Sequence, residues 1–153
     1  GIVSTIKVDT YLTRGGASEI AIDKLKGASS AGSMTVVGEG GSTTTNLQQG
    51  LAKSWIHVAN NQSINDSLNI SSLDDDGTGD YGININNDFS NATWAFTFGH
   101  DDQAHATIIL STEISQGTQA AGAVDIEQIY VNSSINRTHY DGVFAMTCHG
   151  DLA

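Results

Sequence analysis

The chain has 153 residues, a length that suits one domain or a small domain with an arm. Gly, Ser, Thr, Asn and Asp together supply 72 of these residues, and proline is absent. Because these five types favour turns and are poor in helix interiors, the composition argues against a helical bundle. The formal net charge of −11 argues against general binding to nucleic acid, whose phosphates it repels. No apolar run approaches the ~18 residues of a membrane helix, so membrane insertion is not expected.

The first third of the chain reads as an extended arm. Residues 2–12 alternate apolar and polar side chains and predict a strand or an extended segment. Residues 19–26 fit either a strand or a short helix, and residues 34–37 predict a short strand. Residues 38–45 are small and polar and predict a flexible linker that ends the arm. Residues 46–50 then predict one helical turn that stops at a glycine.

From residue 51 the sequence changes to repeated short alternating segments. The predicted strands cover residues 51–58, 66–73, 80–86, 92–99, 105–112, 124–131 and 142–149. Residues 74–79, Asp-Asp-Asp-Gly-Thr-Gly, predict a turn between two of them. The expected fold is therefore all-β: an antiparallel, jelly-roll-like β-sandwich at residues 46–153, preceded by an extended N-terminal arm at residues 1–45.

The charges are divided unevenly along the chain. Residues 1–53 contain five Lys or Arg and four Asp or Glu, whereas residues 54–153 contain one basic residue, Arg137, and 13 acidic ones. The two parts are expected to face different surroundings, although drift in composition explains the division equally well. An acidic outer domain would stay soluble and resist self-association at high copy number.

Two acidic segments are candidates for binding a metal ion. His100, Asp101, Asp102 and His105 place two imidazoles and two carboxylates within six residues, but structural zinc sites use tighter, recurrent spacings. The acidic run at residues 74–77 suggests a calcium site, because calcium binds clustered carboxylates. However, the run lacks the acidic residues at alternate positions and the late glutamate of an EF-hand. Solvated polar residues are favoured in both places, and no metal site is predicted.

Motifs for catalysis are incomplete. Gly27 and Gly32 have the glycine spacing of a phosphate-binding loop, but the lysine that would reach the phosphates is missing. Ser30 precedes Gly32 by two residues without the first glycine or the strand-turn-helix context of a nucleophile elbow. The sequence therefore predicts no catalytic residue, no cofactor-binding residue and no enzyme.

The cysteine and the aromatic residues are expected in the core. Cys148 shares a predicted strand face with Phe144 and Met146, which indicates a buried thiol. Period-two spacing favours core positions over a sugar-stacking platform for Trp55, Tyr81, Trp94, Phe96 and Phe98. No partner is evident for three scattered histidines, His57, His139 and His149.

One long stretch is similar to a known group of proteins. In residues 67–85, an Asn-Ile-Ser-Ser strand leads into a Gly-Thr-Gly-Asp-Tyr turn and a second strand. This stretch resembles virion fibre and appendage proteins of marine tailed bacteriophages. Residues 4–9, residues 44–53 and the ending Gly-Asp-Leu-Ala at residues 150–153 resemble the same group, whereas residues 100–141 do not.

The resemblance implies a structural protein on the external surface of the virion. Such a protein is a tail-fibre-like or head-decoration appendage and is usually a homotrimer. Its N-terminal part would attach to other virion proteins, of the capsid or the tail, and its β-domain would project outward. The expected partners are therefore other copies of the chain and other virion proteins, with host surface glycans as a further candidate.

Two other functions stay open at this point. A receptor- or carbohydrate-binding module would present aromatic, Asn and Asp side chains in loops 59–65, 99–104 and 133–141. A depolymerase would need paired carboxylates in a groove. Separated acidic residues are plentiful, but no assembled site is visible in the sequence.

Overall fold

The computed structural model describes residues 22–27, 33–101, 108–112 and 119–153. Strands dominate these ranges, and every pairing between them is antiparallel. The all-β prediction is therefore confirmed. The predictions for residues 2–12, for Ser30, and for Asp102 and His105 lie outside the described residues.

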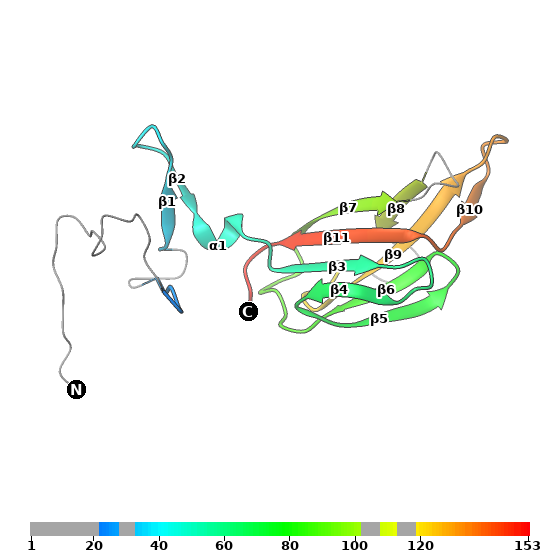
Figure 1. The fold of residues 1–153 in the computed structure, drawn as a ribbon, viewed down its shortest axis with the longest axis horizontal. Coiled ribbons are helices and arrows are strands. Elements are labelled where there is room, and N and C mark those ends of the chain that lie inside the picture. The colour runs from blue at the N-terminus through cyan, green and yellow to red at the C-terminus, as the bar shows by residue number, and fades with distance from the viewer. Residues whose placement is uncertain (1–21, 28–32, 102–107, 113–118) are drawn as a thin grey trace, which may run out of the picture.

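The main body consists of two sheets that face each other (Figure 1). The first has the order β4-β3-β11-β7 and contains β3 (Ser54–Val58), β4 (Ile64–Leu68), β7 (Ala95–Asp101) and β11 (Val143–His149). The second contains β5 (Ile70–Gly77), β6 (Asp80–Ile85), β8 (Ile108–Thr112), β9 (Ala123–Val131) and β10 (Arg137–His139).

The long strand β9 organises the second sheet. Residues 123–127 of β9 pair with β6, and residues 129–131 pair with β10, while β8 pairs with residues 126–130. Strand β8 pairs with residues of β9 that also pair with β6 or with β10. Because each edge of β9 accommodates one partner at a given position, β8 lies on the edge opposite to β6 and β10. The sheet therefore has the order β5-β6-β9-β8, and β10 continues along β9 beyond the start of β6.

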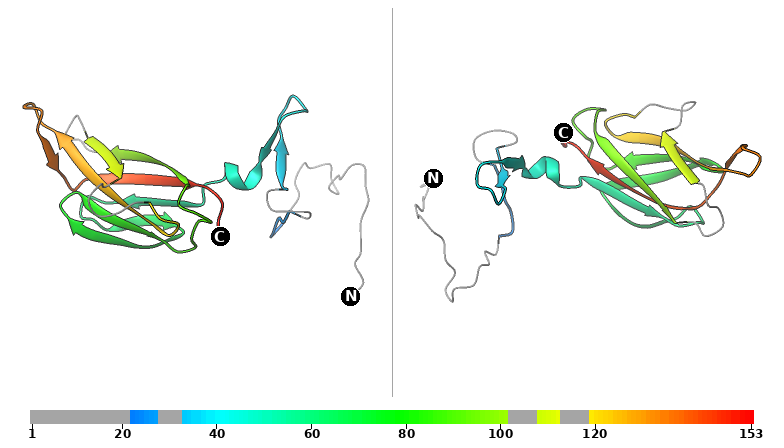
Figure 2. Two further views of the ribbon diagram at one scale, coloured as in Figure 1. Left: turned by 180° about the vertical axis from the view of Figure 1, so that it is seen from behind. Right: turned by 90° about the horizontal axis from the view of Figure 1, so that it is seen from above.

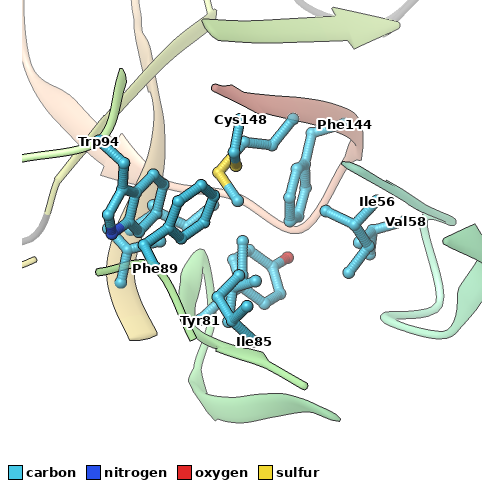
Figure 3. Close-up of a cluster of buried hydrophobic side chains, with 12 residues drawn as sticks. Ile56, Val58, Tyr81, Ile85, Phe89, Trp94, Phe144 and Cys148 are labelled. Atoms are coloured by element: carbon cyan, nitrogen blue, oxygen red, sulfur yellow. The ribbon is translucent and has the colours of Figure 1, made fainter. Parts of the chain in front are cut away.

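The core fills the space between the two sheets (Figure 3). Along β11, buried side chains alternate with half-buried ones, and Phe144, Met146 and Cys148 point inward. They meet Ile56 and Val58 of β3 and inward residues of the other sheet, Tyr81, Ile83, Ile85, Val124 and Ile126. The predicted burial of Cys148 is confirmed, and the alternation follows from the two-residue period of a strand.

Three short elements lie beyond one end of the sandwich (Figures 1 and 2). They are β1 (Thr35–Val37), β2 (Thr44–Asn46) and α1 (Leu47–Gly50), and β1 pairs with β2. The expected strand at residues 34–37 and the helical turn are confirmed. The Asn46 side chain caps α1 by accepting a hydrogen bond from the Gln49 amide at 3.0 Å.

Residues 38–45 form a hairpin turn and the start of β2, so the prediction of a flexible linker there is wrong. The Gly38 amide donates to the Thr43 carbonyl oxygen at 2.8 Å, and Gly41 has a φ of 78°. Small residues serve a tight turn as well as a linker, because glycine reaches positive φ without steric cost. Composition alone does not separate the two.

The prediction of one strand at residues 66–73 is also wrong, since β4 and β5 meet there. Asn69 has a φ of 58°, a left-handed conformation in which the chain leaves one sheet and enters the other. The predicted turn at residues 74–79 is shorter than expected, because β5 continues through Gly77 and only Thr78 and Gly79 turn. Strand β10 was not predicted.

Candidate interaction surfaces

The segment before the sandwich exposes apolar side chains. We call residues 22–27 and 33–53 the proximal segment. Five of its large apolar side chains are more than half exposed, and none of its described residues is buried. They are Ile22, Leu25, Val36, Val37 and Leu51. An open hollow of about 330 Å³ beside α1 is lined mainly by apolar residues of this segment. Isolated exposed apolar residues are ordinary, but a segment without any core of its own is not self-sufficient.

The proximal segment joins the sandwich through few polar contacts. The Lys53 amide donates to the Cys148 carbonyl oxygen at 2.9 Å, which places the junction beside the end of β11. The Gln49 side-chain amide donates to Asp151 at 3.3 Å. Two open hollows, of about 330 and 470 Å³, flank this contact, and both include Gln49 and Asp151 in their walls.

One outer face of the sandwich is strongly acidic. We call the outward side chains of β5, β6 and β9 that carry carboxylates the acidic face: Asp74, Asp76, Asp80, Asp125 and Glu127. Gly82 lies among them, and a Cβ atom there would be within 3.5 Å of Asp74, Asp76 and Asp125. Because glycine has no side chain, position 82 leaves room for the side chains of Asp74, Asp76 and Asp125 to lie close to one another.

Burial and the neighbouring carboxylates together perturb the titration of Asp80. Burial raises the pKa of its carboxyl group above 3.8, and the charge of Asp76 raises it further, while His139 opposes the shift. Weaker contributions from Asp125 and Glu127 also raise this pKa. Asp80 therefore holds its charge at a cost to the folded state, first because it is partly desolvated and then because like charges repel.

The other outer face of the sandwich has a different character. In one row across four strands, β4, β3, β11 and β7 present Leu68, Trp55, Thr147 and Thr97. The next row presents His57, Ala145 and Gly99, with Asp66 at the β4 edge. His57 and Asp66 thus share this face with seven outward residues that carry no charge: Trp55, Leu68, Ala95, Thr97, Gly99, Ala145 and Thr147. A shallow hollow of about 220 Å³ lies on it, beside His57 and Gly99.

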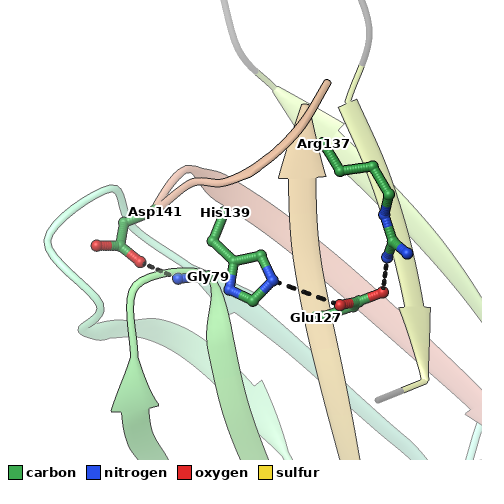
Figure 4. Close-up of polar contacts among 5 residues, drawn as sticks. All are labelled: Gly79, Glu127, Arg137, His139 and Asp141. Atoms are coloured by element: carbon green, nitrogen blue, oxygen red, sulfur yellow. Dashed lines mark hydrogen bonds and ion pairs between the residues drawn. The ribbon is translucent and has the colours of Figure 1, made fainter. Parts of the chain in front are cut away.

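A polar cluster holds the end of the sandwich farthest from the proximal segment (Figure 4). Glu127, whose side chain is 12% exposed, pairs with the Arg137 guanidinium through one carboxylate oxygen. Its other oxygen lies 3.6 Å from His139 Nε2. The β9–β10 hairpin brings both partners back to Glu127. Sequence reasoning missed this pairing of His139, although two basic residues at alternate positions near an acidic strand are a usable signal.

The same end is fixed by a turn that requires glycine. Gly79 has a φ of 69°, and a Cβ atom there would lie 2.3 Å from the Gln128 carbonyl oxygen. The Gly79 amide donates to Asp141 at 2.6 Å, and the Tyr81 hydroxyl donates to the same carboxylate oxygen at 3.1 Å. Burial, together with the charge of Asp141, raises the pKa of Tyr81. These contacts serve the structure, since Tyr81 is fully buried.

Among the described residues, the candidate metal ligands and the cysteine are not brought together. His100 is exposed in β7, and the side chain of Asp101 and all of Asp102 and His105 are outside the description. Across the described ranges, no three His, Cys, Asp or Glu side chains are arranged to hold a metal ion. Burial raises the pKa of the Cys148 thiol to about 12, so this group is a poor nucleophile.

The candidate sugar-stacking residues mostly belong to the core. Tyr81 and Trp94 are buried, and Trp94 stacks on Phe89 with ring centroids 4.7 Å apart. Phe96 and Phe98 are partly buried and extend this row of rings along β7. Only Trp55 of the five lies on an outer face.

Comparisons with known proteins give no match: no family model fits the chain, and no curated protein or solved structure is significantly similar to it. Among the residues whose structure is described, no helix has the length and apolar character needed to cross a membrane. The surfaces described above are therefore the basis for the functional argument.

Proposed function

We propose that this protein is a bacteriophage virion structural protein, a fibre or capsid-surface appendage located on the outside of the particle. Its N-terminal part attaches to the particle and joins copies of the chain into a homotrimer. Its β-sandwich projects outward. The exposed apolar side chains of the proximal segment carry this proposal.

The proximal segment needs a partner to bury its apolar surface. Val36 and Val37 are 51% and 57% exposed, and Leu25 is 61% exposed. Each large aliphatic side chain gains about 1.5–3 kcal/mol when fully buried, so several together favour association. The sandwich, in contrast, buries a hydrophobic core of its own between its two sheets. This division fits an attachment segment joined to a self-sufficient outer domain.

The charge distribution supports the same division of roles. All but four of the chain's 17 acidic residues lie in residues 54–153. An outward domain with this charge stays soluble when many copies are crowded on one particle. The proximal segment contains Lys24, Lys26 and Lys53 and carries no such excess of negative charge. The sequence resemblance of residues 67–85 to phage virion proteins points in the same direction.

The decisive experiment measures how many copies of the protein a purified particle contains. Quantitative mass spectrometry would compare the protein with the major capsid protein. Hundreds of copies would identify a head decoration, and a small multiple of three or six would identify a tail or portal fibre. Absence from the particle would overturn the proposal. Light scattering on the intact chain tests the trimer, which a stable monomer would contradict.

A second candidate function, receptor or glycan binding, is favoured by the position of the loops. The loops after β3 and β9 lie at the end of the sandwich opposite the proximal segment (Figure 1). Ile135 at the β9–β10 turn is 85% exposed. However, Asn61 and Asn132 use their side-chain oxygens to accept hydrogen bonds within their own loops.

Parts of the expected binding loops are in fact strands. Ile64 begins β4, Gly99 lies in β7, and residues 137–139 form β10. The surface left for a glycan is therefore smaller than loops 59–65, 99–104 and 133–141 suggest. Binding of the intact chain on a glycan array would support this second function, and loss of that binding in an Ile135→Ser variant would locate it. A flat array would leave only the structural function.

A further inference from the structure

The chain contains two Asp-Gly dipeptides, Asp76-Gly77 and Asp141-Gly142, and the fold places them in opposite environments. In such a dipeptide the aspartate carboxyl group and the next backbone nitrogen are close enough along the chain to react with each other. Glycine favours this reaction, because it has no side chain to hinder the approach and its backbone adopts many conformations. Since the two dipeptides share this chemistry, a difference between their rates comes from the structure around them.

We propose that Asp76-Gly77 is a site of spontaneous covalent modification, at which aspartate converts into isoaspartate, and that the fold protects Asp141-Gly142 from the same reaction. The inference goes beyond the proposed function and does not depend on it, because the reaction needs only the folded chain and water. The modification is assigned to the acidic face, at the end of β5 and farthest from the proximal segment (Figure 1).

The reaction passes through a cyclic succinimide. The backbone nitrogen of Gly77 attacks Cγ of Asp76, so that a C–N bond forms and the carboxyl C–OH bond breaks, and the amide proton and the hydroxyl group leave as water. Water then adds to one of the two ring carbonyl groups, and the C–N bond there breaks. Opening at Cγ restores aspartate, whereas opening at the main-chain carbonyl leaves isoaspartate, with the chain connected through Cγ. No oxidant or reductant takes part, and the mass is unchanged.

The structure leaves the reacting groups of Asp76-Gly77 open. Both residues are exposed, and the register between β5 and β6 shifts between Asp75 and Gly77, so Asp76 lies in an irregularity of the ladder. The Gly77 amide donates to the Asp75 carboxylate at 3.2 Å, a long contact at the surface. Among the described residues, no hydrogen bond holds the Asp76 carboxylate. Its side chain is therefore free to turn toward the Gly77 nitrogen, which is the geometry that ring closure requires.

The structure holds both reacting groups of Asp141-Gly142 with other partners. One oxygen of the Asp141 carboxylate accepts hydrogen bonds from the Gly79 amide at 2.6 Å and from the Tyr81 hydroxyl at 3.1 Å. Gly142 is buried, and its amide donates to the Gln128 side-chain oxygen at 3.0 Å. Ring closure at this site therefore requires that the region first opens locally, which lowers its rate.

The modification changes the acidic face without changing its net charge. Isoaspartate adds a carbon atom to the main chain and moves the carboxylate of residue 76 to a different position. Asp76 is one of the charges that raise the pKa of Asp80, so this move alters the electrostatics around Asp80. The added atom lies at the existing irregularity, beyond the pairing of Leu73 with Ile83, and we expect the modified chain to stay folded.

Ageing of the full chain in solution tests the inference. The folded protein is incubated at neutral pH, and isoaspartate is measured at both sites by peptide mapping with electron-transfer fragmentation, which distinguishes the two isomers although their masses are equal. We expect isoaspartate to accumulate at Asp76 at least about tenfold faster than at Asp141, because the held site reacts only after local opening. In denaturant, which releases both sites, we expect the two rates to agree within about threefold.

Two results of this comparison would overturn the inference. Equal rates at Asp76 and Asp141 in the folded protein would show that the fold does not distinguish the two sites. A difference of the same size in denaturant would show that the neighbouring residues in the sequence, and not the fold, set the two rates.

One variant tests the assignment of the reactive residue. Asp76→Glu keeps the charge, but its longer side chain closes a larger ring much more slowly, so we expect the modification of this peptide to disappear. The rate at Asp141 should be unchanged and serves as the control. A modification that persists in the Asp76→Glu variant would place the reaction at Asp74 or Asp75 and would overturn the assignment.

A second variant tests the protection of the other site. Tyr81→Phe removes one of the two hydrogen bonds to the Asp141 carboxylate, and we expect isoaspartate at Asp141 to form at least about threefold faster. Denaturant titration identifies conditions in which this variant is still folded. An unchanged rate at Asp141 in the folded variant would overturn the assigned protection. The comparison of the two sites in the native chain does not depend on this variant.

Discussion

Valine side chains have opposite environments in two regions of this molecule. Val58 of the sandwich is completely buried, whereas Val36 and Val37 of the proximal segment are about half exposed. The sandwich buries a hydrophobic core of its own between two sheets. The proximal segment has one short hairpin and one helical turn, too little structure to cover anything. The same residue type therefore stabilises a fold in one region and offers a contact in the other.

The largest predicted effect comes from emptying the core. Phe144→Ala removes a fully buried ring that lies against Tyr81, with ring centroids 5.2 Å apart. We expect a loss of about 3–5 kcal/mol in the free energy of unfolding, measured by denaturant titration with tryptophan fluorescence. A loss below about 1 kcal/mol would mean that the sandwich is not the self-sufficient unit of this comparison.

A second prediction compares two glycines within the sandwich. Gly79→Ala forces a Cβ atom against the Gln128 carbonyl oxygen at a positive φ, so we expect a loss of at least about 2 kcal/mol. Gly99→Ala places its Cβ atom in open space and should change stability by less than about 1 kcal/mol, with a gain favoured. Thermal unfolding of both variants checks the pair. Equal losses would show that the Gly79 turn is not a constraint.

The acidic face gives a smaller, pH-dependent effect. The pKa of Asp80 is raised above 3.8 in the folded state. Between pH 3.8 and that raised pKa, the folded state therefore binds more protons than the unfolded state. The contribution of Asp80 to stability therefore falls as pH rises through that window. Asp80→Asn should stabilise the sandwich at pH 7 by less than about 1 kcal/mol, with the gain disappearing toward pH 3.8.

The control for Asp80→Asn removes a carboxylate from the other sheet. Asp66→Asn, at the edge strand β4, is expected to change the melting temperature less than Asp80→Asn at pH 7. Both variants should be measured by thermal unfolding across the acidic range. A stabilising gain at Asp80→Asn that grows as the pH falls would have the wrong sign.

The smallest effect on unfolding is expected in the proximal segment. Val36→Ser with Val37→Ser should change the stability of the sandwich by no more than about 0.5 kcal/mol, because neither side chain packs against its core. The same double variant should weaken assembly, seen as a lower mass by light scattering. The matched change Ile135→Ser, at an exposed apolar position of the opposite end, should leave the mass unchanged. An unaltered mass in the double variant would separate the exposed valines from self-association.

Most of the strands could be predicted from the sequence, because the alternation of apolar and polar residues that marks a strand lies within the strand itself. The inward set of β11, for example, follows from simple alternation at Phe144, Met146 and Cys148. The helical turn was also predictable, since a cap such as Asn46 acts within three residues. The break at Asn69 was not, because alternation continues across it and only the backbone reverses direction between the sheets.

The candidate surfaces were less predictable than the strands. Charge counting located an acidic half, but only the sheet order places Asp74, Asp80 and Asp125 on one side. The pairing of His139 with Glu127 depends on the β9–β10 hairpin, whose short second strand has no alternating pattern of its own. Exposure of Val36 and Val37 reflects how few neighbours they have among the described residues, which no local sequence pattern reports.

The direction of β3 has a mechanical consequence. This strand begins at the junction with the proximal segment and runs toward the opposite end, between β4 and β11 (Figure 1). Its hydrogen bonds to both neighbours are perpendicular to the strand. A pull between the junction and the far loops would load all of these bonds in shear at the same moment, whereas a sideways pull would open them one after another. The sandwich is thus built to resist tension along its length better than peeling from its edge.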